Sequence, residues 1–410
     1  MPTSSDEARP VSSLWDRSRL SPRLRPALSG ENRGGARENR IAVVTGALSG
    51  APAPTTQYAR SGGLNIAYQV FGAGPPAVVL VPGFISHVEF AWHEPLLARF
   101  LGKLSAFTRV VAFDKRGMGL SDRDPRRETP SLAERMDDIA AVMDAAGCPR
   151  AALLAWSEGG PASLLFARYA PERVAALMLV GTTTRFTAGE DFPEGIPRDM
   201  LELFIDTMRE DWGTGVGFEL YAPSMADDAR MRSWWASYQR FASSPGAVAA
   251  SLRMHLDVDV RHLLPDIAVP TLIMHRTHDM LVPVECARST AARIPGAQYI
   301  EQPGEDHMYW LGDQDGTLLA MRDFLAGTPE GAPIATLRQS RRRPAVGWES
   351  LTEAEMDVVR LVTAGMTNRQ IAVRLYLSPR TIQTHVSHIM RKLGIARRSE
   401  IAAETSRRQR

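Results

Sequence analysis

The sequence predicts an α/β protein followed by a small all-α domain. From Tyr58 to about Leu325, short apolar segments of strand length alternate with amphipathic segments of helix length. This alternation is typical of a mainly parallel sheet covered by helices on both faces. From Trp348 onward, the sequence pattern indicates short helices only, each with residues typical of a helix start or a helix end. The 410 residues, 44% hydrophobic and 23% charged, suffice for two or three globular domains.

Composition divides the chain into four parts. Residues 1–55 are rich in Ser, Pro, Arg and Gly, and we interpret them as a disordered extension or an over-long gene start. We expect the α/β domain at 56–326, a linker at 327–347 and the helical domain at 348–410. From Arg341 onward, 14 Lys and Arg face 6 Asp and Glu, so this end carries +8 of a total net charge of +2 and the rest carries −6. This asymmetry favours contact of the C-terminal end with phosphate, although the run at 341–343 fits either that contact or a solvated hinge.

Seven segments of the α/β domain fit strands: LNIAYQVF, AVVLVPG, RVVAFD, AALLAWS, VAALMLVG, TLIMHRT and AQYIEQ. Amphipathic segments such as LAERMDDIAAVMDAAG and PASLLFARYA lie between them as helices. We interpret the carboxylates of the first of these helices as a solvated face.

The two cysteines, Cys148 and Cys286, are too few for a disulfide framework and lack metal-ligand spacing. We therefore expect buried thiols in a reducing compartment, the cytoplasm, with no bound metal or cofactor. No apolar run approaches the roughly 18 residues that a membrane span needs.

The segment AWSEGG places Ser157 at a corner between a strand and a helix. A sharp turn there strains the serine backbone, so the residues two positions away, Ala155 and Gly159, have to be small, although the common pattern has glycine at the first. A buried serine at a helix start would fit the same local pattern. Asp279 and His307 follow the last two predicted strands, in the order expected of a Ser-Asp-His triad.

These three side chains have a chemical use together. A serine hydroxyl is a weak nucleophile until an imidazole accepts its proton, and a carboxylate fixes the tautomer of that imidazole and stabilises its charged form. We therefore predict Ser157, Asp279 and His307 as catalytic residues. An oxyanion hole is expected from the backbone N–H groups of Phe84, in the VPGF loop, and Glu158.

Together with the turn DKRGMGLSD at 114–122, these motifs resemble the α/β-hydrolase family across nearly all of 58–325. Their forms are especially similar to hydrolase domains joined to nucleotide cyclases or regulatory modules in bacteria, and no cyclase fits here. The resemblance implies a helical lid over the nucleophile at about 186–262. The aromatic residues of this lid either line a pocket for a small apolar ligand or only pack the lid. They include Trp212, Phe218, Tyr221, Trp234, Trp235, Tyr238 and Phe241.

The C-terminal segment carries clear helix signals. Two capping boxes of the form T-x-x-E/Q mark helix starts at Thr352 and Thr367. Gly365 and Gly394 lie where a left-handed residue would end a helix. A third helix is expected to begin at Pro379, because proline favours the first helical position. Only 376–378 separate it from the second helix, which is short enough for helix-turn-helix geometry.

The predicted third helix has one apolar and one polar face. Ile382, Val386, Ile389 and Leu393 recur at helical spacing and should pack on the other helices. The amide, hydroxyl and guanidinium groups of the opposite face suit base edges and phosphates in a major groove, although a plain three-helix bundle also needs polar cover. The residues of this face are Gln383, Thr384, Ser387, His388 and Arg391.

The segments GMTNRQIAVRL, LSPRTIQTHVSHI and RKLGIARRSEI closely resemble the LuxR-type helix-turn-helix domain, from Trp348 to about Arg408. The resemblance implies that the helix Pro379–Leu393 enters the major groove of double-stranded DNA and that the last helix, from Ser399, helps to form a homodimer. It places Gln383, Thr384 and Ser387 against bases. It makes five residues candidates for phosphate contact: Arg380, Thr381, His385, Arg391 and Lys392. Arg398 matches a position that we interpret as structural or phosphate-facing.

Position 383 departs from many relatives, which carry Lys there. On side-chain geometry, Gln383 favours contact with adenine over guanine. The operator sequence does not follow from this residue alone.

Two functions fit these features. The first is a transcriptional regulator whose hydrolase domain senses, and either binds or slowly hydrolyses, a small apolar ligand. The alternative is a serine hydrolase of esterase or lactonase type that carries a DNA-binding domain. A carboxylate-nucleophile reaction is disfavoured because the elbow position is Ser157. A phosphorelay response regulator is disfavoured because the N-terminal part is too long and its motifs belong to another fold.

Overall fold

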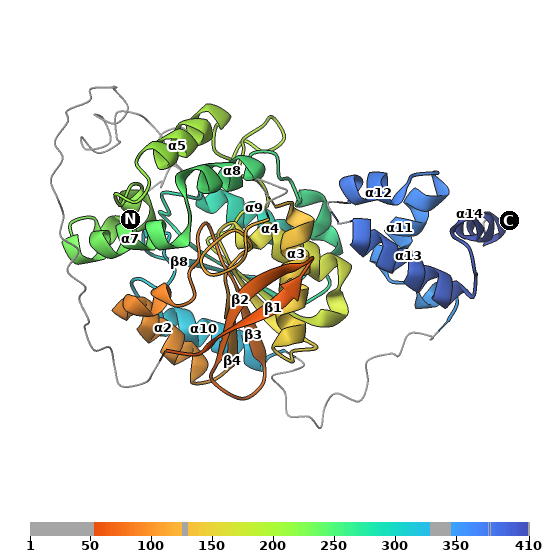
Figure 1. The fold of residues 1–410 in the computed structure, drawn as a ribbon, viewed down its shortest axis with the longest axis horizontal. Coiled ribbons are helices and arrows are strands. Elements are labelled where there is room, and N and C mark those ends of the chain that lie inside the picture. The colour runs from red at the N-terminus through yellow and green to blue at the C-terminus, as the bar shows by residue number, and fades with distance from the viewer. Residues whose placement is uncertain (1–52, 125–129, 329–345, 376, 378, 409–410) are drawn as a thin grey trace, which may run out of the picture.

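The computed structural model describes residues 53–124, 130–328, 346–375, 377 and 379–408. Residues 1–52, most of the predicted linker and the run 341–343 lie outside this part, as do Tyr376 and Ser378. The first domain is built on an eight-stranded sheet in the order β1-β2-β4-β3-β5-β6-β7-β8 (Figure 1). Its strands are β1 (Thr56–Ser61), β2 (Leu64–Phe71), β3 (Ala77–Val81), β4 (Arg109–Phe113), β5 (Ala151–Trp156), β6 (Val174–Val180), β7 (Thr271–Arg276) and β8 (Gln298–Gln302).

The prediction of a mainly parallel sheet is confirmed. Only β1 with β2 and β2 with β4 pair antiparallel, and the other neighbours are parallel. Every residue of β6 and all but the last of β5 are buried, as expected of central strands covered on both faces. The sequence pattern did not predict β1, whose TQYARS is too polar to stand out.

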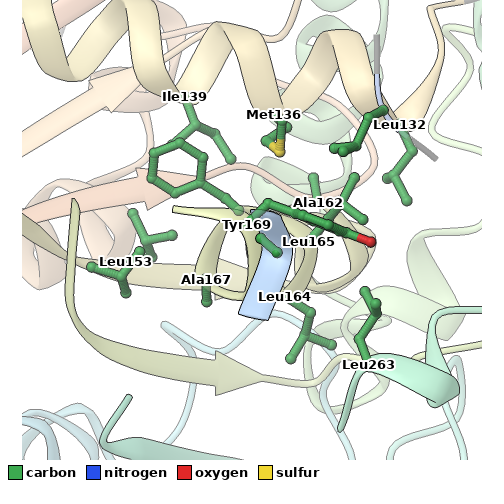
Figure 2. Packing of buried hydrophobic residues seen from close by; sticks show 14 of the residues in the cluster. Leu132, Met136, Ile139, Leu153, Ala162, Leu164, Leu165, Ala167, Tyr169 and Leu263 are labelled. Atoms are coloured by element: carbon green, nitrogen blue, oxygen red, sulfur yellow. The ribbon is translucent and has the colours of Figure 1, made fainter. Parts of the chain in front are cut away.

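Helices cover both faces of the sheet. Side chains alternate along each strand, so Leu153 of β5 packs under one layer and Leu154 under the other. Figure 2 shows Leu153 of β5 and, on the helix above the strands, Met136 and Ile139 of the first layer; all three belong to one buried hydrophobic cluster. That layer consists of α3 (Leu132–Ala145), α4 (Gly159–Tyr169) and α9 (Val284–Arg293), and the other of α2 (Pro95–Ser105) and α10 (Gln314–Ala326).

The carboxylates of helix α3 are not all exposed to solvent, contrary to the expectation from the sequence. Asp138 is 1% exposed and forms a buried ion pair with Arg116, at 2.5 Å between Oδ1 and Nη2. Glu134 completes a capping box with Ser131 at the helix start. The interpretation of this face as wholly solvated is therefore wrong, because a buried partner from a distant loop neutralises one of its charges.

The segment between β6 and β7 is mainly helical and lies over the carboxyl ends of the strands. The predicted lid falls within this segment. Its helices are α5 (Arg198–Glu210), α6 (Phe218–Tyr221), η4 (Pro223–Met225), α7 (Ala229–Ala242), α8 (Pro245–His255) and η5 (Arg261–Asp266).

The C-terminal domain is all-helical, as expected. Both predicted capping boxes form, and Gly365 and Gly394 have φ values of 79° and 67°. Its elements are η7 (Trp348–Ser350), α11 (Glu353–Thr363), α12 (Asn368–Arg374), α13 (Pro379–Leu393) and α14 (Arg398–Arg408). The third helix begins at Pro379 as predicted, and the last begins one residue before the expected Ser399. Ile382, Val386 and Ile389 of α13 are buried.

Candidate functional site

Ser157 lies at a sharp turn between β5 and α4. Its φ is 52°, which makes it the one non-glycine residue with positive φ in the described part of the chain. The turn is held by hydrogen bonds of its backbone: Ser157 N–H donates to the Val180 carbonyl at 3.1 Å, and the Thr182 hydroxyl donates to the Ser157 carbonyl. Such a strained strand-to-helix turn presents a serine Oγ at the edge of the sheet.

Gly159 and Gly160, the second and third residues after Ser157, have no room for side chains. A Cβ on Gly159 would lie 2.7 Å from the Val81 carbonyl oxygen, and one on Gly160 would lie 1.9 Å from Oγ1 of Thr182. Because the first contact is with backbone, no rotamer change relieves it. The expectation that Gly159 has to be small therefore has a direct steric cause.

Asp279 and His307 are joined at the predicted position. Nδ1 of His307 lies 2.8 Å from Oδ2 of Asp279, while Oδ1 of Asp279 accepts the N–H groups of Leu281 and Val282 at 2.9 and 3.0 Å. Burial alone would raise the pKa of Asp279, but His307 and these hydrogen bonds outweigh it and lower that pKa. Asp279 is thus an ionised partner that fixes the orientation of His307.

The far nitrogen of His307 is free to act. Its Nε2 is buried and makes no hydrogen bond to Ser157 or to any other described residue. The indole N–H of Trp156 donates to the His307 carbonyl at 3.0 Å, which ties the histidine loop to the residue before Ser157. An imidazole nitrogen without a hydrogen-bond partner is one that can accept a proton.

Phe84 and Glu158, the predicted oxyanion donors, are bridged by Lys115. The ammonium of Lys115 donates to the Phe84 carbonyl at 2.8 Å and to the Glu158 carboxylate. Within the described residues neither the Phe84 nor the Glu158 backbone N–H has an acceptor. Both are therefore available to an anionic oxygen, and the sequence motifs contained no sign that Lys115 links them.

Glu158 is the centre of a buried polar cluster that sequence reasoning missed. Besides Lys115, it accepts a hydrogen bond from Arg135 at 2.7 Å, and Nδ1 of His255 lies 3.3 Å from its Oε2. Burial would raise the pKa of Glu158, but His255, Lys115 and Arg135 lower it to about 2. Burial lowers the pKa of Lys115 to about 8 and that of His255 to about 4. At neutral pH the cluster therefore holds an ionised carboxylate and a neutral imidazole.

Two cavities lie near the elbow, and one of them reaches Ser157. This cavity of about 50 Å³ is lined by Phe84, Ser157, Glu158, Phe186, Ile196, Leu201, Phe204, Ile205, Tyr221, Leu252, His255, Leu256 and Leu281. The other, of about 100 Å³, is lined by Trp234, Trp235 and Tyr238 among others, but not by Ser157. Of the seven aromatic residues named from the sequence, only Tyr221 lines the cavity at the serine, together with Phe186 and Phe204 of the same segment. Most of the others therefore serve packing or the second cavity.

The polar face of α13 is where the sequence predicted it. Gln383, Thr384, Ser387, His388 and Arg391 are all exposed. Gln383 accepts a hydrogen bond from the Asn368 side chain at 2.8 Å, which links the start of α12 to α13.

Three of the residues predicted for phosphate contact have partners within the protein, and the side chain of a fourth is not described. The Thr381 hydroxyl donates to Asp137 of α3 at 3.1 Å, and the His385 ring lies 6.2 Å from that of Tyr169 in α4. Burial lowers the pKa of His385 to about 4. Lys392 pairs with Glu355 at 2.7 Å. The side chain of Arg380 is not described, and Arg398 donates to the Asn368 side chain and the Met366 carbonyl.

The α11–α13 group therefore sits against the α3–α4 layer (Figure 1). Arg168 of α4 strengthens this contact, because its guanidinium lies 2.6 Å from Asp357 of α11 and 3.1 Å from Asp266. Its side chain is 3% exposed, so solvent screens the pair weakly.

Two further observations bear on ligands. Among the described helices, none is both long enough and apolar enough to cross a bilayer. Within the same residues no three His, Cys, Asp or Glu side chains gather as metal ligands, and Cys148 and Cys286 are buried free thiols.

Comparison with known families matches both parts of the chain. The family described as alpha/beta hydrolase fold matches 76–313, more than half of the chain. The family described as bacterial regulatory proteins, luxR family, matches 349–405.

Individual relatives fall on one part or the other. A candidate HTH-type transcriptional regulator of Mycobacterium bovis is 44% identical over 114 residues, which are 24% of this chain and only 13% of that protein. A pimeloyl-[acyl-carrier protein] methyl ester esterase of Xanthomonas campestris pv. campestris is 30% identical over 265 residues, 63% of this chain and 98% of the esterase. An esterase structure from Exiguobacterium antarcticum has a TM-score of 0.57 at 24% identity and covers 66% of this chain and 99% of that one, which shows the shared fold.

Proposed function

The chain belongs to the α/β-hydrolase fold family and ends in a DNA-binding domain of the luxR family, and from this premise we propose that it is a transcriptional regulator that senses a small apolar ligand at Ser157. One observation carries the proposal. Helix α4 starts at Gly159, directly after the serine elbow, and ends at Tyr169, which packs on His385 of α13. One helix thus connects the candidate ligand site to the candidate DNA-reading helix.

Helix α3 provides a second connection. Arg135 bonds to Glu158 beside the nucleophile, and Asp137, on the same helix, accepts a hydrogen bond from Thr381 of α13. A ligand that binds one arrangement of α3, α4 and α13 more tightly than another shifts the population toward that arrangement. The regulator would act in the cytoplasm, as a homodimer on promoter DNA with α14 at the dimer contact.

The same site supports a chemical step. Ser157 Oγ would attack an ester carbonyl while His307 Nε2 takes its proton and Asp279 stabilises the imidazolium. The resulting oxyanion would accept the N–H groups of Phe84 and Glu158. The alternative function, a serine hydrolase with a DNA-binding domain, is favoured by these free donors and by the esterase relative.

A serine-trapping probe tests the sensor directly. A p-nitrophenyl alkylphosphonate would form a covalent bond from its phosphorus to Ser157 Oγ and release p-nitrophenolate. The affinity for duplexes selected from a random library is then measured with and without the probe. We expect a change of roughly fivefold or more in the wild type, the lower end of common allosteric couplings. Ser157→Ala should show none.

Two results separate the candidate functions. Full modification of Ser157 with unchanged DNA affinity would remove the sensor. Equal turnover of p-nitrophenyl butyrate by the wild type and Ser157→Ala would remove catalysis by this site, because loss of a nucleophile should reduce turnover by about 10⁴-fold or more.

A further inference from the structure

The cavity at Ser157 is apolar except at a few atoms. Its side chains with polar atoms are those of Ser157, Glu158, Tyr221 and His255. Lys115 and Arg135 donate to Oε1 of the charged Glu158 carboxylate, and Nδ1 of His255 lies 3.3 Å from its Oε2. Ser157 is the proposed nucleophile. The remaining neutral hydrogen-bonding groups are therefore the Tyr221 hydroxyl and the His255 ring.

The tautomer of His255 follows from its contacts. Its Nδ1 lies 2.9 Å from the carbonyl oxygen of Ser251, which can only accept. Nδ1 therefore carries the proton, and Nε2 presents a lone pair. The ring is 4% exposed, and burial lowers its pKa to about 4, so it stays neutral near pH 7.

Nε2 of His255 has no partner. It is buried and makes no hydrogen bond within the described residues. A buried acceptor left without a partner destabilises the protein, so a ligand group that donates to it binds more tightly. A bound water would need two to four polar partners, which the mostly apolar lining supplies poorly.

We propose that Nε2 of His255 accepts a hydrogen bond from the ligand held at Ser157, so that this ligand is an apolar chain or ring bearing a neutral donor, a hydroxyl or an amide N–H. This assignment rests on the proposed function, because it takes Ser157 as the site where the ligand binds. Groups that only accept cannot bond to this lone pair. An anionic group would also meet the nearby charge of Glu158.

The test compares donor and non-donor probes on Ser157→Ala protein, which removes turnover. The probes are methyl hexanoate and its hydroxy and methoxy derivatives substituted at carbon 2, 3, 5 or 6. Binding is measured by quenching of intrinsic tryptophan fluorescence. At one position the hydroxy ester should bind about tenfold more tightly than its methoxy counterpart, which keeps the oxygen but has no donor.

A second substitution assigns the preference to His255. In the His255→Asn variant, the new side-chain amide can still donate to the Ser251 carbonyl but has no acceptor at the place of Nε2. The hydroxy-to-methoxy ratio should fall to about one. Because both affinities are measured on the same variant, a loss of affinity common to both probes cancels in their ratio. Tyr221→Phe, the matched control in the same cavity, should keep the ratio.

Each outcome is decisive. If no hydroxy ester binds more tightly than its methoxy counterpart, the assignment fails. It also fails if the preference survives His255→Asn or disappears in Tyr221→Phe alone. The proposed function would still stand in all three cases if the phosphonate changed DNA affinity through Ser157.

Discussion

The two candidate sites differ in how deeply their residues are embedded in the fold. Ser157, Asp279 and His307 are each under 5% exposed, whereas Gln383 and Arg391 on α13 are exposed to solvent. In the first domain the residues that would do chemistry are buried among the residues that hold the turn and the sheet. In the second, an apolar stripe packs the helix and a separate polar face is exposed, where we expect the contact with DNA. Substitutions of the residues packed around Ser157 should therefore damage stability, whereas substitutions on the exposed face of α13 should affect only binding.

The largest expected effect is steric. Gly159→Ala places a Cβ 2.7 Å from the Val81 carbonyl oxygen, so it should lower the free energy of unfolding by about 3 kcal/mol. Gly102→Ala in α2 is the control: its Cβ meets nothing within 4 Å, and it should stabilise the helix by about 1 kcal/mol. Chemical denaturation measures both. If the two variants were equally stable, the turn at Ser157 would not be tightly packed, and the contrast between the two sites would fail.

Acid should weaken the first domain through His255. Its pKa is about 4 in the folded protein and about 6.5 when unfolded, so between these values the unfolded chain binds a proton that the folded chain does not. The free energy of unfolding should fall by roughly 2–3 kcal/mol as pH drops from 6.5 to 4. Urea titrations across this range should show a shallower slope for His255→Asn. The charged groups facing the ring are Glu158, Arg135 and Lys115. If the slope of His255→Asn equals that of the wild type, protonation of His255 does not destabilise the folded protein.

Substitutions on the exposed face of α13 should change the affinity for DNA and leave the stability of the protein unchanged. Gln383→Ala should cost about 1–3 kcal/mol of binding and relax preference at one base pair. Arg391→Ala should weaken all sequences alike and make the salt dependence shallower by about one unit. Fluorescence anisotropy at several salt concentrations measures both, and thermal melting should stay unchanged. A drop in melting temperature, or binding unaffected by either change, would contradict the assigned surface.

The smallest effect should come from the contact between the two regions. Asp137→Ala removes the acceptor of the Thr381 hydroxyl, one of the predicted phosphate contacts, so the freed hydroxyl should let α13 bind DNA about three- to fivefold more tightly. Asp144→Ala removes the same charge from an exposed position on the same helix and controls for general electrostatics. If both variants gain equally, the contact has no specific part in DNA binding.

Local patterns were enough to predict much of this architecture. The strands after β1, both capping boxes and the start of α13 at Pro379 were predicted because each depends on residues within a few positions of one another. The order of Ser157, Asp279 and His307 relative to the strands also follows from topology. The Asp279–His307 contact therefore lies where the pattern places it, while its catalytic use stays a prediction.

The missed features join residues far apart in the chain. Lys115, Arg135 and His255 gather on Glu158 from three separate elements, and each had an ordinary local explanation. Glu355 was interpreted as a cap alone, yet the same carboxylate also holds Lys392. The contact of His385 with Tyr169 depends on how two domains dock, which no periodicity within either domain encodes.

The backbone angle of Ser157 has one more implication. A side chain held at a φ of 52° is disfavoured by about 1–3 kcal/mol relative to relaxed backbone, and glycine escapes most of that penalty. A glycine at this position should therefore make the protein more resistant to heat while removing the hydroxyl. The φ angle of this one residue therefore sets thermal stability against the proposed reactivity. Selection for thermostability alone would favour glycine and lose the serine hydroxyl.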